Sequence, residues 1–371
     1  MVEDAATGMV RVRRGRVVAV GEERPGAIEV SVLVEPDGIA CDALAYPDVT
    51  GPVAVGDTVI LNTTARHLGL GTGGFHLVMG VVDGPPVELG HPGRTMKLRY
   101  TPSQVAVRAV EESHREAIES SRGLEGTPVV SAPLHSMVGP IAAGAKAAGG
   151  TRVVYVMTDG AALAGALSRL VPRLRRAGLL DGFVTCGQAF GGELEAVTIW
   201  TGLLAAKEIL GADVIVVSDG PGNLGTETTW GVTALEAGHA LNAAATLRGR
   251  PVAALRISFA DPRDRHRVVS HHSLTILGEV CSAGVNVAVP VLEDEEERDA
   301  VWDRLRARRL EDRHQLVEVD GRPALELLDE LGVVVKSMGR TAADDPAFFL
   351  AAGAAGVLAA RMAAGSRRYR V

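Results

Sequence analysis

The feature that most constrains the fold is an alternation of two kinds of segment through the later part of the chain. Strand-length segments that are apolar almost throughout are separated by helix-length stretches rich in alanine and leucine. The expected strands lie at residues 128–132, 152–158, 182–186, 213–218, 251–259, 285–291, 314–319 and 333–337. Strands this apolar are buried on both faces, and helices between them indicate right-handed parallel crossovers. We therefore predict an α/β fold with a doubly wound, mostly parallel sheet.

The first part of the chain shows no helical period. Short segments rich in β-branched residues are separated by glycine, proline or aspartate, at 10–20, 27–35, 57–62 and 76–82. Strands without intervening helices indicate a small β-rich, barrel-like domain. The segment Gly84–Gly93 is dense in proline and glycine and is expected to be a connector. The predicted domains are therefore residues 1–95 and 96–371, with a helix from Ser103 to Arg122 opening the second.

Composition narrows the class of partner. The 371 residues carry a formal net charge of -7, whereas a nucleic-acid-binding protein normally presents a basic face. The three cysteines are far apart, which indicates neither a disulfide framework nor a cysteine zinc site. The N-terminus is acidic where a secretory signal is basic, so we expect a cytoplasmic protein.

The most apolar stretch, Ala347–Ala364, is alanine-rich and interrupted by Arg361. It falls short of the ~20 strongly apolar residues that a membrane span needs. We expect a packed terminal helix there and no membrane partner. Alanine-rich helices of this kind would suit a homodimer.

Two glycine-rich loops follow predicted strands, at the strand ends where open parallel sheets bind ligands. The first contains Gly191 and Gly192, on a turn expected to lead into a helix and to offer backbone N–H groups to an anion. A purely conformational turn is the alternative. The second runs from Asp219 to Gly231 and is long and polar. Its candidate ligand-binding residues are Gly222, Asn223, Gly225 and Thr226. Neither loop matches a Walker motif or the dinucleotide fingerprint, so no cofactor is indicated.

The densest polar segment runs from Arg256 to Ser273, directly beyond an apolar strand. Its arginines suit bidentate binding of an anion, and the candidate clamps are Arg256, Arg263 and Arg267. The candidate acid and base groups are His266, His271 and Asp261. Surface charges beside a helix that starts near Ser270 are the alternative interpretation.

A metal-binding His/Asp group is a second possibility for the same segment. The spacing of its histidines matches no known zinc pattern, so we assign no metal. Because neighbouring side chains diverge on a helix or strand, at most one of His271 and His272 is expected to join His266. A smaller candidate is an acid/base couple of His135 and Asp159. The alternative is a helix N-cap at Thr158 or Asp159.

Taken together, these loops resemble a bacterial family catalogued as domain of unknown function 3866, over nearly the whole chain. The resemblance rests on TCGQAFGGELEAV from Thr185, GPGNLGT from Gly220, GRPVAALRISFADPRDRHRVVSHHS from Gly249 and SMGR from Ser337. The family pattern tends to have glycine where Glu227 and Val268 stand here. The resemblance supports the site and implies no particular reaction.

Our leading hypothesis is an enzyme that acts on a small anionic or phosphorylated metabolite at these strand-end loops. The observation behind it is the density of arginine and histidine at one strand end. The alternative is a ligand-sensing or oligomeric scaffold protein that uses the same loops without turnover.

Overall fold

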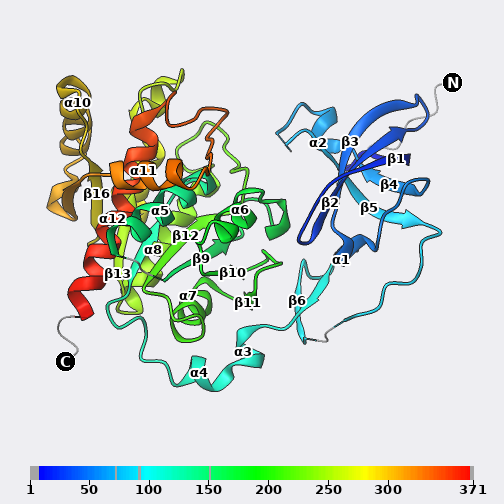
Figure 1. The fold of residues 1–371 in the computed structure, drawn as a ribbon, viewed down its shortest axis with the longest axis horizontal. Coiled ribbons are helices and arrows are strands. Elements are labelled where there is room, and N and C mark those ends of the chain that lie inside the picture. Colours follow the sequence, from blue (N-terminus) through cyan, green and yellow to red (C-terminus); the bar gives the residue numbers. More distant parts are fainter. Residues whose placement is uncertain (1–7, 72, 91–92, 150–151, 368–371) are drawn as a thin grey trace. The chain divides into compact units, whose positions relative to one another are not determined.

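The computed structural model describes residues 8–71, 73–90, 93–149 and 152–367. Contacts within the chain divide it into two compact units (Figure 1). The first comprises Met1–Pro92 and Leu98–Ala106, and the second comprises Gly93–Lys97 and Val107–Val371. The first is rich in strands and the second is an α/β structure.

The first unit contains a closed five-stranded barrel in the order β1-β2-β3-β5-β4. Its strands are β1 (Val12–Arg24), β2 (Ala27–Val34), β3 (Ile39–Ala45), β4 (Thr58–Asn62) and β5 (His76–Val82), with short helices α1 (Pro47–Thr50) and α2 (Thr64–His67). Val17, Val32, Val59 and Leu61 are buried together in the barrel core. The expected barrel-like domain is confirmed. The sequence did not suggest β3, whose apolar residues are interrupted by an aspartate, although this strand pairs with both β2 and β5.

The second unit is built on an eight-stranded sheet in the order β11-β10-β9-β12-β8-β13-β16-β17. Every paired neighbour in it is parallel. The strands are β8 (Pro128–Ser131), β9 (Val153–Thr158), β10 (Gly182–Cys186), β11 (Leu194–Ala196), β12 (Val214–Asp219), β13 (Arg250–Ala254), β16 (Asn286–Pro290) and β17 (Gln315–Val319). The predicted doubly wound α/β fold is confirmed.

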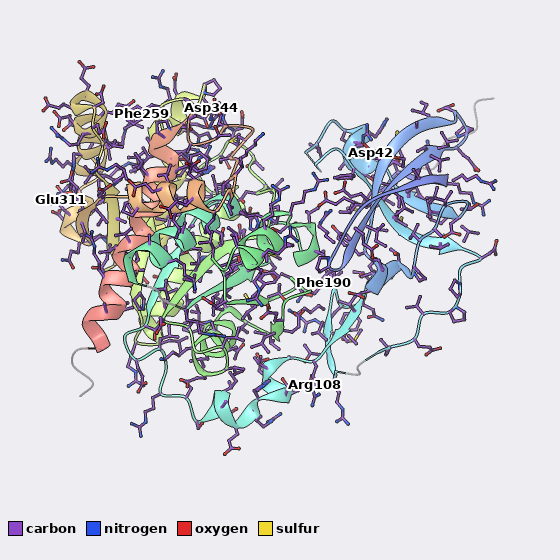
Figure 2. The ribbon with its side chains drawn as sticks, in the orientation of Figure 1. Asp42, Arg108, Phe190, Phe259, Glu311 and Asp344 are labelled. Carbon is purple, nitrogen blue, oxygen red and sulfur yellow. The ribbon has the colours of Figure 1, made fainter. Side chains whose placement is uncertain are left out.

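Helices cover both faces of this sheet, and alternate strand residues point to opposite layers. In β9, Tyr155 belongs to the core cluster that includes residues of α5, α6, α11 and α12, whereas Val154 and Val156 belong to the cluster that includes residues of α7 and α8. Side chains fill the space between the sheet and its helices (Figure 2). The helices are α5 (Val138–Gly149), α6 (Leu170–Arg176), α7 (Ile199–Glu208), α8 (Glu236–Thr246), α9 (His271–Thr275), α10 (Glu295–Arg306), α11 (Arg322–Glu330) and α12 (Pro346–Arg367).

Three local expectations were wrong. Residues 333–337 form no strand, because the backbone N–H of Val333 bonds to the Leu328 carbonyl at the end of α11 and Ser337 pairs only with Arg340, in an isolated bridge. The turn after β10 leads into the short strand β11, and helix α7 begins only after Thr198, whose side chain caps it. The long helix expected from Ser103 is replaced by β7 (Val105–Val107), α3 (Val110–Ser113) and α4 (Arg115–Glu119). The extended conformation of Ala109 and the non-helical backbone of His114 interrupt it.

Helix α12 is long and apolar enough to cross a membrane by length and composition, but 78% of that stretch is buried inside the structure. It packs against α5 and α11 and lies beside β13 and β16 (Figure 1). Its apolar character is therefore accounted for by core packing.

Glycines allow α12 and α5 to approach closely. A Cβ atom on Gly356 would overlap the carbonyl oxygen of Ile141 in α5, whereas a Cβ on Gly365, in the same helix, would meet nothing within 4 Å. We expect Gly356→Ala to lower the free energy of unfolding by roughly 1–3 kcal/mol through overpacking. Gly365→Ala should be neutral or stabilising, by up to about 1 kcal/mol, because alanine favours a helix. Urea unfolding of both variants checks this, and equal effects would contradict the close approach.

Candidate functional site

A cavity of about 710 Å³ opens at the carboxyl end of the central strands β12, β8 and β13. The loops that follow these three strands supply much of its lining, including Ser136, Gly222 and Arg256. The direction in which successive strands are added to the sheet also reverses here. Strands β9 and β10 lie on one side of β8, whereas β13 and β16 lie on its other side. Open α/β sheets bind ligands at such a point.

The lining of the cavity is strongly basic. Its only acidic residue among those described is Glu227. The basic residues that line it are Arg169, Arg173, Arg256, Arg263, Arg265 and Lys336. Such an excess of arginine and lysine favours an anionic occupant.

Asp261 holds two of these arginines in place. Its side chain is fully buried, and its Oδ2 accepts from Nη2 of Arg256 at 3.1 Å and from Nη2 of Arg263 at 2.9 Å. Nε of Arg263 also donates to Oδ1 at 2.9 Å, so that pair is bidentate. These hydrogen bonds from Arg263 hold the pKa of Asp261 well below its usual range. Asp261 therefore remains ionised and orients arginines, which does not fit the acid/base role expected from the sequence.

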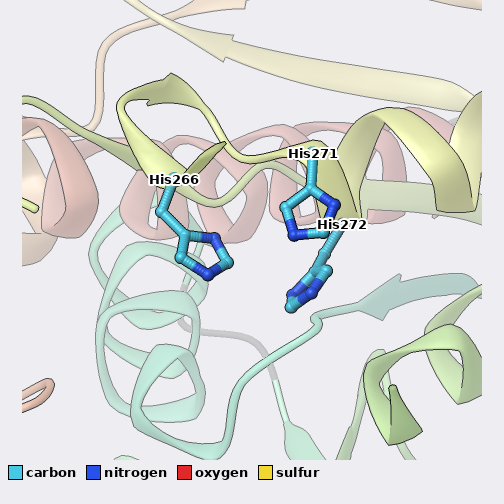
Figure 3. A group of neighbouring side chains, drawn as sticks. All are labelled: His266, His271 and His272. Atoms are coloured by element: carbon cyan, nitrogen blue, oxygen red, sulfur yellow. The ribbon is translucent and has the colours of Figure 1, made fainter. Parts of the chain in front are cut away.

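The three histidines of the segment come together (Figure 3). The ring centroids of His266 and His271 are 5.1 Å apart, those of His266 and His272 4.9 Å, and those of His271 and His272 4.1 Å. The expectation that only one of His271 and His272 could join His266 was wrong. Both are the first residues of α9, and long side chains in a first turn lean back toward the helix N-terminus, on the side of His266.

All three imidazoles are kept neutral near pH 7. Burial, followed by Arg256 and Arg263, lowers the pKa of His266 from 6.5 to about 3. Burial and His271 lower the pKa of His272 to about 3, and burial with Arg265 lowers that of His271. An imidazole with so low a pKa is a weak general base at neutral pH, but it keeps a lone pair for a hydrogen bond or a metal.

A buried hydrogen-bonded chain lies beside the cavity. Nε2 of His135 and Oγ of Ser168, both from cavity-lining residues, are 2.7 Å apart, and Nδ1 of His135 is 3.0 Å from the hydroxyl of Tyr155. The Tyr155 hydroxyl donates to the Asp219 carbonyl, so it accepts from Nδ1–H and leaves Nε2 to accept from Ser168. The expected couple of His135 and Asp159 is not formed, because Asp159 accepts from the backbone N–H of Gln188.

The carboxyl end of β12 carries a second buried acid. Asp219 is 3% exposed, and Thr158 donates to its Oδ1. Burial raises the pKa of Asp219 to about 7. The sequence placed this residue at the start of the polar loop without giving it a role, since nothing in a lone aspartate at a strand end indicates such burial.

The structure does not bring Gly191 and Gly192 to the cavity. Their backbone N–H groups donate to Oε1 of Glu195, and Gly192 also donates to Oγ1 of Thr185. Glu195 is in turn paired with buried Lys97, at 2.6 Å. A carboxylate of the chain itself therefore occupies the position expected for an external anion, and no helix begins at this turn.

The loop after β12 is divided between the cavity and the surface. Gly222, Asn223 and Gly225 line the cavity, and Asn223 is held by a bond from Nδ2 to the Pro133 carbonyl, at 2.9 Å. Thr226 does not line it, because its hydroxyl closes the loop on the Gly231 carbonyl. Glu227 lines the cavity and pairs with Arg265 at 2.9 Å.

Arg267 is exposed and is not brought to the cavity, since it follows buried His266 in an extended conformation that turns it to the opposite side. The next residue, Val268, has a φ of 61°, and Glu227 has a φ of 65°. Left-handed backbone favours glycine. Glycine, which the resemblance implies at both positions, would adopt this conformation without strain.

The profile of a family described as protein of unknown function (DUF3866) matches residues 42–356, which is most of the chain. The matched range includes the loops after β8, β12 and β13 and all three clustered histidines. The chain matches no curated protein.

Proposed function

Because the chain belongs to the DUF3866 family of proteins of unknown function, its role has to be inferred from its site, and we propose that it binds a small anionic metabolite as the substrate of an enzyme. The observation that carries the proposal is the lining of the cavity, with six basic residues and one acidic residue. A volume of about 710 Å³ suits a small metabolite.

The arginines support binding of a phosphate or carboxylate group in particular. Arg256 is 5% exposed, lines the cavity and donates to Asp261 through Nη2, which fixes its guanidinium there. A preorganised guanidinium loses little side-chain entropy when an oxyanion binds. Arg265 is held by Glu227 at the same cavity.

The histidines support a modified catalytic role. With their pKa values lowered by burial, His266 and His272 would accept hydrogen bonds from a ligand or coordinate a metal more readily than they would remove a proton. We therefore assign His266 and His271 a role in contacting the ligand, in place of the acid/base role expected from the sequence.

The test is a thermal-shift comparison of anions at equal ionic strength. We expect inorganic phosphate, or a phosphorylated metabolite compared with its unphosphorylated form, to raise the melting temperature above that in chloride. The variant Arg265→Gln should bind the same anion about tenfold more weakly, because a charge-assisted hydrogen bond is lost. Arg361→Gln is the matched control, since Arg361 is exposed and does not line the cavity.

Two results would count against the proposal. If no anion raises the melting temperature above that in chloride, the cavity is not an anion site. If a ligand binds but is recovered intact after prolonged incubation with the full chain, the protein is a sensor of that ligand and the enzymatic part fails.

A further inference from the structure

We propose that His266, His271 and His272 form a binding site for a divalent transition metal of the zinc class, at the edge of the basic cavity. One nitrogen from each ring can be chosen so that all three lie within 4.8 Å of one another. Figure 3 shows the three rings facing a common space. Nitrogens bound to one tetrahedral zinc lie roughly 3.4 Å apart, so small side-chain rotations would bring these donors to an ion.

A second observation points to a missing ligand at the same place. Nε2 of His271 is buried and has no hydrogen-bond partner in the described part of the chain. Buried polar atoms in native proteins are almost always paired, and an unpaired one needs an explanation. A metal ion bound to this nitrogen would provide one.

The contacts of His266 indicate which of its ring nitrogens carries the lone pair. Nε of Arg265 lies 3.4 Å from Nε2 of His266, and Ser270 Oγ lies 2.9 Å from its Nδ1. Arginine can only donate, so Nε2 is the acceptor and Nδ1 carries the proton that is donated to Ser270. A histidine that donates one ring N–H to a fixed oxygen and offers the other nitrogen is the usual arrangement of a metal ligand. The contact with Arg265 is long, so a metal would readily replace it.

The type of donor selects the metal. Three imidazoles suit zinc, cobalt, nickel or copper, whereas magnesium and calcium require oxygen ligands. The buried carboxylate of this segment, Asp261, is already engaged by Arg256 and Arg263.

The basic lining should couple the binding of the metal to that of the anion. Arg256, Arg263 and Arg265 disfavour a further positive charge beside them, and a bound anion would offset that repulsion. We therefore expect metal and anion to strengthen each other's binding, a coupling that rests on the proposed function. Three protein ligands also leave a coordination position for water or for an oxygen of that anion.

The experiment is a titration of the full, untagged chain with Co²⁺ alone, without added phosphate. We expect visible absorption typical of a tetrahedral cobalt site, saturating at one ion per chain. His271→Gln and His272→Gln should each weaken binding at least about tenfold. His239→Gln is the matched control, because His239 is exposed, lies outside the group and pairs with Glu236.

Circular dichroism of the variants should be unchanged, since His271 and His272 are only partly buried. Absence of the absorption band, or equal binding by His271→Gln and the parent chain, would overturn the metal site. Because the titration contains no phosphate, its outcome is independent of the anion test. Phosphate binding without cobalt binding would overturn only the proposed metal site. Cobalt binding without phosphate binding would overturn only the proposed anion site.

Discussion

Asp261→Asn is expected to lower the free energy of unfolding of the second unit by roughly 3–5 kcal/mol. The side chains of Asp261 and Arg256 are 0% and 6% exposed, and Arg263 binds the same carboxylate. Asparagine has nearly the same shape but no charge, so the variant leaves Arg256, Arg263 and Arg340 without this counter-ion, and Arg256 is buried. The three tryptophans, Trp200, Trp230 and Trp302, all lie in the second unit, and their fluorescence during urea unfolding therefore reports on it.

Asp320→Asn provides a matched control. Asp320 binds Arg322 two residues later, as Asp261 binds Arg263, with a backbone N–H bond of 2.9 Å and side-chain bonds of 3.0 and 2.8 Å. The side chains of this second pair are 33% and 56% exposed. Exposed pairs contribute about 0–1 kcal/mol, so the two substitutions separate the effect of burial from that of the local motif.

Acid should reveal the same interaction. The pKa of Asp261 is lower in the folded than in the unfolded chain, so its contribution is complete above about pH 4 and is lost as the pH falls further. Asp261→Asn should therefore flatten the fall in stability below pH 4. An effect of Asp261→Asn no larger than that of Asp320→Asn would show that the arginines do not depend on this carboxylate.

The sequence predicted those features of the fold that follow from uniform apolar segments. Seven of the strands in the large sheet were expected, because each contains a run of apolar residues, and all but the edge strand β17 are largely buried. These seven are β8, β9, β10, β12, β13, β16 and β17. Strand β11 was not expected, because Leu194–Ala196 is only three residues long and has a glutamate at its centre. Its position depends on pairing with β10, which a local pattern does not reveal.

The candidate site was predictable only in part, for a related reason. The density of charge placed Arg256, Arg263 and His266 at a strand end, and all three line the cavity. Ser168 and Lys336 were missed, because each stands alone in an unremarkable segment and reaches the cavity only through the fold. The roles of individual side chains were harder still to predict. The sequence around Asp261 is equally compatible with a role as a general acid and with a role in orienting arginines.

Lys97 shows this limit most clearly, and it carries the second large prediction. Its side chain is 1% exposed and its Nζ donates to Glu195 Oε2 at 2.6 Å, to the Thr185 carbonyl at 3.3 Å and to the Ala189 carbonyl. No sequence pattern marked this lysine. Glu195 also accepts hydrogen bonds from the backbone N–H groups of Gly191 and Gly192, which we expected from the sequence to bind an external anion.

We expect Lys97→Met to lower the free energy of unfolding by roughly 3–5 kcal/mol, because the side chain of Glu195 is 12% exposed and loses its counter-ion. Tryptophan fluorescence in urea measures this. The double variant with Glu195→Gln should be less destabilised than the sum of the two single variants, since it removes both charges together.

Glu193→Gln supplies the matched control from the same loop. Glu193 pairs with Arg175, and their side chains are 40% and 36% exposed, so a loss within about 1 kcal/mol is expected. If Glu193→Gln and Glu195→Gln cost the same, the turn after β10 is not organised by Lys97. A larger loss for Glu195→Gln would show that the buried Lys97–Glu195 pair organises this turn, whose Gly191 and Gly192 N–H groups donate to Glu195.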